Sequence, residues 1–186
     1  MECRKFDIKT SFIFLYIPQM YEYKLLFPGE YLDPSFADKW WIKFRPLCDW
    51  DFEKWFCDVL WELTSCNTNK QKFLEIFEKM YAINQIEPQY LIIVWEDINN
   101  WKIAACWSII IENKFIHEWQ AVGHIEDIVI SKEYRWRWLW EHIISILKDI
   151  ANKNCYKVIL DCDEKNLWFY EKCWLSPKSL WLAKYF

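Results

Sequence analysis

Three short motifs carry side chains that are well suited to moving protons. They are HIEDI, with Glu126 and Asp127, LDCDEKN, with Asp161, and LWFYEK, with Tyr170. Carboxylates and phenols can each act as a general acid or base. Neighbouring residues of a strand face opposite ways, so only one of Glu126 and Asp127 can enter a given site through its side chain. Taken alone, an acidic pair is more often solvated surface, and a tyrosine is more often part of a core. Asp161 lies in an expected apolar strand, where an unpaired carboxylate is costly, and this favours a functional role.

These motifs belong to one stretch, residues 123–175, which reads GHIEDIVISKEYRWRWLWEHIISILKDIANKNCYKVILDCDEKNLWFYEKCWL. The stretch resembles the acetyl-CoA-binding half of the glucosamine-6-phosphate N-acetyltransferases, a family of the GNAT superfamily. The resemblance covers residues from about 42 to 180. It implies transfer of acetyl from acetyl-CoA to the 2-amino group of glucosamine 6-phosphate, on the route to UDP-N-acetylglucosamine. It also implies direct attack in a ternary complex, with no acyl-enzyme.

The coenzyme motif of GNAT enzymes lies at a turn from a strand into a helix. It holds Arg or Gln, two variable residues, Gly, one further residue, and Gly or Ala. Unpaired N–H groups at the helix N-terminus bind the pyrophosphate, and small residues let it approach the backbone and permit positive φ. The resemblance therefore implies that coenzyme is bound by the matching run here: Arg135, Trp136, Arg137, Trp138, Leu139 and Trp140.

Tryptophan stands where this family has glycine. The chain holds 15 Trp and 2 Gly, although glycine averages about 7% of residues. The resemblance suggests glycine origins for further tryptophans as well: Trp50, Trp55, Trp61, Trp107, Trp168 and Trp174. Indoles could fill the space of the pyrophosphate, and overpacking costs about 1–3 kcal/mol. A flat platform of tryptophans that stacks on sugars is disfavoured, because their helical spacing does not make one exposed face.

The resemblance also assigns roles to the proton-moving residues. Glu126 and Asp127 correspond to strand residues that contact the amino sugar, and Asp161 to the carboxylate that orients the amine. Coenzyme contacts fall on Asn166 and on Tyr170, whose hydroxyl is placed to protonate the sulfur. The splayed strand edge that pairs with the pantetheine arm corresponds to Ile128, Val129 and Ile130, with the N–H of Ile128 as the oxyanion donor.

The sugar phosphate needs cationic or hydroxyl partners. Thr64 matches the threonine that the family has at the end of its first helix, and Lys184 or a neighbour replaces a basic residue supplied by the partner subunit. Lys114 and His117 flank the loop before the active strand and are further candidates. The resemblance implies a homodimer that exchanges C-terminal strands, and it implies no metal. The apolar C-terminal end fits such a strand, and it fits an intramolecular edge strand equally well.

Hydrophobic patterning predicts one mixed α/β domain, β-α-α-β-β-β-α-β-α-β, over residues 39–186, preceded by an extension over residues 1–38 that packs on it. This order is also that of the GNAT fold, which the resemblance implies. Strands are expected at 41–45, 90–95, 102–112, 125–130 and 156–162, with a closing strand from about 179. Helices are expected at about 52–63, 70–82, 139–152 and 166–172, the first capped by Asp49 or Asp51.

Composition narrows the class of protein. A net charge of −4 argues against nucleic acid as a partner. No apolar run approaches the roughly 20 residues that span a bilayer, and the short apolar run at 11–17 lacks the features of a signal peptide. The 8 cysteines show no C-x-x-C spacing and the 3 histidines no metal-ligand spacing, so we expect reduced thiols, no metal and a cytoplasmic protein.

The sequence thus favours a cytoplasmic glucosamine-6-phosphate N-acetyltransferase that uses acetyl-CoA. Two alternatives stay open. One is a GNAT enzyme for another amine, which a panel of amine acceptors would distinguish. The other is a folded dimer that no longer binds coenzyme, because Trp136, Trp138 and Trp140 fill the pyrophosphate turn.

Overall fold

The computed structural model describes residues 23–32, 41–135, 137–173, 175–180 and 182–184, with the backbone alone described for 137–142 and 154. The strands are β1 (Ile42–Pro46), β2 (Tyr90–Asp97), β3 (Lys102–Asn113), β4 (Ala121–Ile130) and β5 (Cys155–Ile159). The helices are α1 (Phe56–Trp61), α2 (Lys70–Asn84), α3 (Arg137–Asn154) and α4 (Leu167–Lys172). This order confirms the mixed α/β fold that the patterning predicts.

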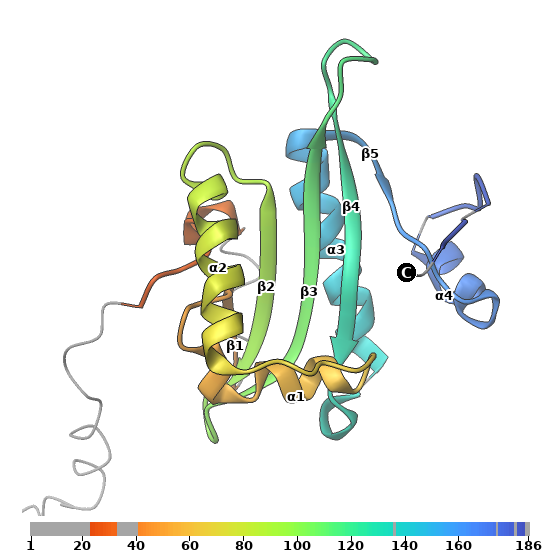
Figure 1. Cartoon of the computed structure of the whole chain (residues 1–186). Coiled ribbons are helices and arrows are strands. Elements are labelled where there is room, and N and C mark those ends of the chain that lie inside the picture. The colour runs from red at the N-terminus through yellow and green to blue at the C-terminus, as the bar shows by residue number, and fades with distance from the viewer. Residues whose placement is uncertain (1–22, 33–40, 136, 174, 181, 185–186) are drawn as a thin grey trace, which may run out of the picture.

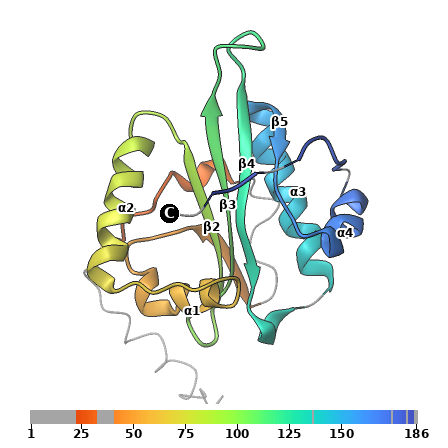
Figure 2. The same ribbon diagram turned by 45° about the vertical axis from the view of Figure 1, so that its right-hand side comes forward.

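The five strands form one sheet in the order β1-β2-β3-β4-β5. The first three pairings are antiparallel, and β4 pairs with β5 in parallel through the crossover helix α3. Helices α1 and α2 cover one face of the sheet and α3 covers the other (Figures 1 and 2). Strands β2 and β3 are buried along most of their length, because both of their faces lie under helices.

The helices are held by an apolar stripe and by local capping. The side chain of Asn69 accepts a hydrogen bond of 2.9 Å from the Lys72 N–H and so caps α2. The buried face of α2 carries Phe73 and Phe77. That of α3 carries five apolar side chains at helical spacing: Ile143, Ile144, Ile146, Leu147 and Ile150.

Part of the N-terminal segment contributes to the same core. Leu26 and Phe27 are almost fully buried, and the N–H of Leu26 donates to the Leu47 carbonyl at 2.8 Å. The buried amide of Asn84, at the end of α2, donates to the carbonyls of Leu26 and Tyr90 at 2.9 and 2.8 Å. Residues 23–32 therefore pack on the domain; the remainder of the expected extension lies outside the described residues.

The first helix is shorter than its apolar pattern indicates. A 3-10 turn at Asp51–Lys54 comes first, and α1 begins only at Phe56. Trp55 interrupts the helix between them, because its φ of 63° is left-handed. Asp51 does not cap the helix, since its carboxylate accepts from Arg45 at 2.7 and 2.8 Å and from the Cys48 N–H at 2.8 Å.

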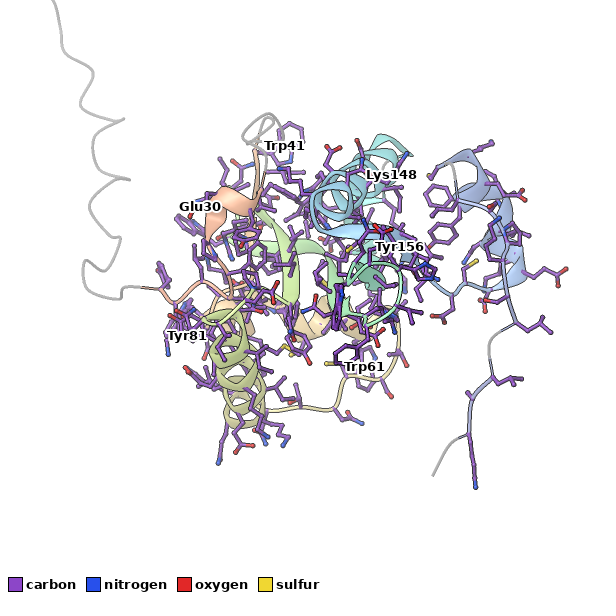
Figure 3. All side chains as sticks on the ribbon, turned by 90° about the horizontal axis from the view of Figure 1, so that it is seen from above. Glu30, Trp41, Trp61, Tyr81, Lys148 and Tyr156 are labelled. Carbon is purple, nitrogen blue, oxygen red and sulfur yellow. The ribbon has the colours of Figure 1, made fainter. Side chains whose placement is uncertain are left out.

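The C-terminal half also departs from the expectation in two places. Strand β5 ends at Ile159, so Asp161 lies in an exposed segment after the strand rather than within it. The argument that burial makes Asp161 costly therefore does not hold. No strand follows α4 in the described part of the tail, where Leu180 is 95% and Leu182 is 91% exposed. Figure 3 shows this segment extending away from the body of the domain. In the described part of the tail, no residue pairs with a strand of the sheet, so the expected closing strand is absent there.

Among the helices of the described residues, none has the length and apolar character needed to cross a bilayer.

Candidate active site

A bulge in β4 marks the centre of the site. Cys106 of β3 pairs with Val129 and Ser108 pairs with Glu126, so a single residue of β3 faces Asp127 and Ile128 together. Asp127 has a φ of 51°, which an aspartate tolerates better than most residues. Bulges of this kind bend a strand and re-aim its side chains, and they are frequent next to active sites.

Strands β4 and β5 separate just before this bulge. Their pairing runs from Ala121 and Cys155 as far as His124 and Ile159. Beyond His124, no described residue of β5 pairs with β4, and Figure 1 shows β5 diverging from it. The β4 edge from Ile128 to Ile130 therefore faces an opening, where its backbone N–H and C=O groups can pair with an extended ligand.

Electrostatic coupling through Asp161 links Glu126 and Tyr170 at this opening. Burial raises the pKa of Glu126, and the charges of Asp161 and Asp127 raise it further. Burial also raises the pKa of Tyr170 to about 12, with smaller contributions from nearby thiols and from Asp161. Tyr170 therefore keeps its proton at neutral pH and can donate it, while Glu126 is a stronger base than an ordinary glutamate.

Asp127 lines a small cavity on the other side of β4. The cavity, of about 230 Å³, lies between the sheet and helices α1 and α2, and Cys57, Cys66, Thr68 and Trp107 also line it. Asp127 keeps part of its side chain exposed, and burial of the rest raises its pKa. Burial, followed by the neighbouring thiol of Cys66, raises the pKa of Cys57 to about 12, so Cys57 is a protonated thiol.

The turn between β4 and α3 begins directly after the bulged end of β4. Arg135 donates from Nε to the Ile130 carbonyl at 3.0 Å and from Nη2 to the Glu62 carboxylate at 3.0 Å. Helix α3 begins at Arg137, so positions 138 and 140 adopt helical backbone in its first turn. Trp136 lies outside the described residues, as do the side chains of residues 137–140.

Comparison with known proteins decides the family. Glucosamine 6-phosphate N-acetyltransferase 1 of Dictyostelium discoideum is 43% identical over 148 residues, which cover 77% of this chain and 90% of that protein. The crystal structure of glucosamine-6-phosphate N-acetyltransferase from Arabidopsis thaliana matches with a TM-score of 0.72 and 37% identity, and the match covers 78% of this chain and 98% of that one. The chain belongs to the glucosamine 6-phosphate N-acetyltransferase family.

This is a family of acyltransferases with the GNAT fold. A predicted acetyltransferase from Clostridium acetobutylicum, whose structure was solved with acetyl-CoA, matches with a TM-score of 0.60 over 77% of this chain and 96% of that one. At 15% identity this likeness shows the shared fold alone. No family model matches the chain.

The residues expected of this family at the sugar phosphate are not brought together within one chain. Thr64 is exposed just after α1. Lys114 pairs with Glu112 at 2.5 Å, and the ring of His117 packs on Tyr156 with ring centres 4.5 Å apart. Both lie at the β3–β4 hairpin, whereas the bulge lies toward the other end of β4. Lys184 is exposed in the tail.

Two coenzyme candidates lie on α4 and just before it. Asn166 is exposed and immediately precedes α4, and its N–H donates to the Asp163 carbonyl at 2.8 Å. Tyr170 lies four residues later, within α4, and is half-buried. Helical spacing therefore places both residues on one side of α4.

Sequence reasoning did not identify Glu62, Cys66 or Thr68 as site residues. Cys66 and Thr68 lie in the irregular segment after α1, where no hydrophobic period marks a face, and Glu62 is a polar residue of the helix expected over 52–63. Only the tertiary contacts to β4 and to the β4–α3 turn reveal them. Within the described ranges, no group of three or more His, Cys, Asp or Glu side chains is arranged to hold a metal ion.

Proposed function

We propose that this protein transfers acetyl from acetyl-CoA to the 2-amino group of D-glucosamine 6-phosphate, giving N-acetylglucosamine 6-phosphate. The observation that carries the proposal is the opening between β4 and β5 beside the β4 bulge, with Glu126 on β4 and Asp161 just after β5. The Dictyostelium and Arabidopsis relatives bear the name of this activity.

The residues around the opening fit acetyl-CoA as a co-substrate. The free edge of β4 at Ile128, Val129 and Ile130 offers backbone groups to the pantetheine amides. The pyrophosphate is expected at Arg135 and the first turn of α3, where helix N–H groups lack internal partners. Asn166 and Tyr170 complete the coenzyme contacts.

The proposed reaction is direct attack in a ternary complex. The neutral amine nitrogen forms a bond to the thioester carbonyl carbon, and the bond from that carbon to sulfur breaks. The Ile128 N–H is placed to donate to the oxygen that gains charge, and Tyr170 donates its proton to the departing sulfur. Asp161 and Glu126 orient the amine, and the proton that the nitrogen releases returns through them and solvent to Tyr170.

We also propose that the active form is a cytoplasmic homodimer. The exposed apolar tail at Leu180 and Leu182 supports this, because a second copy would supply the edge that the tail lacks here. The phosphate of the sugar would then contact Thr64 of one chain and basic residues of the other, for which Lys184, Lys114 and His117 are the candidates.

The test begins with calorimetric titration of the purified protein with acetyl-CoA, followed by thiol release when glucosamine 6-phosphate is added. We expect binding and one thiol released per amide formed. Glucosamine without the phosphate and a panel of other primary amines are the matched acceptors. Faster thiol release with another amine would show that this amine, and not glucosamine 6-phosphate, is the acceptor. A folded dimer that does not bind acetyl-CoA would show that the pyrophosphate turn is closed.

We further propose that tryptophan occupies positions at which this family has glycine. Among the described residues, six non-glycine residues have positive φ, and three of them are Trp55, Trp101 and Trp119. Neither glycine is in this region. Left-handed backbone costs an L-residue about 1–2 kcal/mol, whereas glycine adopts it freely.

Two matched variants test whether left-handed backbone favours glycine at such a position. Trp55, 48% exposed with a φ of 63°, and Trp61, 54% exposed at the end of α1, differ mainly in backbone conformation. Trp55→Gly should raise the free energy of unfolding by about 0.5–1 kcal/mol, after loss of the Lys102 cation–π contact. Trp61→Gly should lower it by about 0.5–1 kcal/mol. Equal losses in urea denaturation of both variants would contradict the proposal.

A further inference from the structure

Glu62, the residue that follows α1, joins this helix to the turn between β4 and α3. Its carboxylate accepts from the Ser131 hydroxyl at 3.0 Å, from the Lys132 N–H at 2.9 Å and from Arg135 Nη2 at 3.0 Å. About 70 residues separate the partners in sequence. One partly buried carboxylate thus contacts three of the six residues that lead from β4 into α3.

The other contacts of this turn hold it to the sheet. The Ser131 N–H donates to the Ala104 carbonyl at 2.9 Å, and the Tyr134 hydroxyl donates to Asp97 at 2.6 Å. Arg135 donates to the Ile130 carbonyl of β4 itself. These bonds fix the turn against β2, β3 and β4. Glu62 is the residue that fixes it against α1, and it also orients the guanidinium of Arg135.

We propose that Glu62 is a positioning residue for the coenzyme, which holds Arg135 and the β4–α3 turn in the conformation that receives the pyrophosphate. The inference rests on the proposed function, because that function places the coenzyme at this turn.

The sign of the expected effect separates positioning from simple electrostatics. A carboxylate near a bound pyrophosphate repels it, so removing its charge would tighten binding if charge were its whole contribution. A carboxylate that aligns Arg135 and the turn has the opposite effect, because a misplaced donor no longer reaches the phosphate. A loss of affinity on neutralising Glu62 therefore identifies positioning.

The experiment compares Glu62→Gln and Glu62→Ala with Glu53→Gln. Glu53 is a suitable control because it precedes α1 and pairs with Lys70 at 2.7 Å on the exposed surface, away from the turn. Calorimetry gives the Kd for acetyl-CoA, and steady-state kinetics give KM for glucosamine 6-phosphate. We expect Kd to rise about fivefold in Glu62→Gln and about tenfold or more in Glu62→Ala. KM for the sugar should stay within about twofold, and the control should match the wild type.

A second readout follows the turn without ligand. The Lys132 N–H donates to Glu62, so its hydrogen exchange should accelerate in Glu62→Gln while amides inside β3 remain protected. Unchanged or tighter coenzyme binding in both Glu62 variants would overturn the inference and leave the proposed function intact. Absence of coenzyme binding by the wild-type protein would instead overturn the proposed function, and the inference with it.

Discussion

Two glutamates in this domain, Glu96 and Glu126, have pKa values shifted in opposite directions. At the β1–β2 edge, Arg45 lies between Asp51 and Glu96, and Lys54 reaches Glu96 at 2.5 Å. Burial alone would raise the pKa of Glu96, but Arg45 and Lys54 outweigh it and lower the pKa. At the β4–β5 opening, burial and neighbouring acids raise the pKa of Glu126.

The difference is the presence of a paired cation. In the described residues, no salt bridge joins Glu126, Asp127 or Asp161 to a lysine or arginine. A buried carboxylate with cations around it contributes to the fold, whereas an acidic group without a partner is available to a cationic or hydrogen-bonding ligand. The amine of the proposed substrate is such a ligand.

Breaking the ion pairs at the β1–β2 edge should have the largest effect on stability. Arg45→Met leaves Asp51, which is 0% exposed, without its cation, and should lower the free energy of unfolding by about 3–5 kcal/mol. Urea denaturation measures it. Lys70→Met, which breaks an exposed pair with Glu53, should cost less than about 1 kcal/mol. A similar loss in both variants would mean that burial does not distinguish the two ion pairs.

Removing an acid from the opening should reduce the activity strongly and the stability very little. Asp161→Asn should lower kcat/KM by roughly 10²–10³-fold, because the amine loses its orienting carboxylate. Its thermal midpoint should hardly change, since Asp161 is exposed. Asp163→Asn, which removes another exposed acid that pairs with Lys165, is the control. A large loss of stability with little loss of rate would assign Asp161 to the fold instead.

Tyr170→Phe tests the proton donor of the same cluster. We expect kcat to fall roughly 10- to 100-fold, with KM for the sugar almost unchanged. Since the pKa of Tyr170 is about 12, its proton is retained up to at least about pH 10, and wild-type activity should show no loss from Tyr170 below that pH. Tyr156→Phe on β5 is the matched control. A basic limb below pH 10 that disappears in Tyr170→Phe would contradict the assignment.

The smallest expected effect is the difference between the titration midpoints of two glutamates. In a carbon NMR titration, the midpoint of Glu126 should lie above the ordinary glutamate value and that of Glu96 below it. Asp161→Asn should move the Glu126 midpoint down and leave Glu96 in place. By linkage, Glu96 stabilises the fold above its unfolded pKa and loses this contribution as pH falls through its folded pKa. Charging Glu126 opposes folding as pH rises through its folded pKa. Equal midpoints would remove the distinction between the two regions.

Much of this fold could be predicted from the sequence, because the signals for its helices and strands are local. The period of apolar residues in 70–82 and 139–152 predicts α2 and α3, and the expected strands match β1 to β5 within a few residues at most ends. The site motifs could be located for the same reason, since HIEDI and LDCDEKN end up on either side of the opening. Their roles remain predictions.

What failed were features that depend on backbone strain or on a distant partner. The period of residues 52–63 is helical, yet the left-handed Trp55 divides the segment. The strand expected to contain Asp161 ends two residues earlier, where β5 leaves β4. The tail has a strand-like composition, but a strand forms only where another edge accepts its hydrogen bonds.

The sequence by itself determined the family, the order of helices and strands, and which residue types are present for acetyl transfer, because periodicity and motifs are properties of neighbouring residues. The tertiary structure alone decided which carboxylates have cations. Arg45 and Glu96 are 51 residues apart, and Glu62 and Arg135 are 73 apart. Such pairs meet only when the sheet is assembled, and the electrostatic character of each carboxylate follows from that assembly.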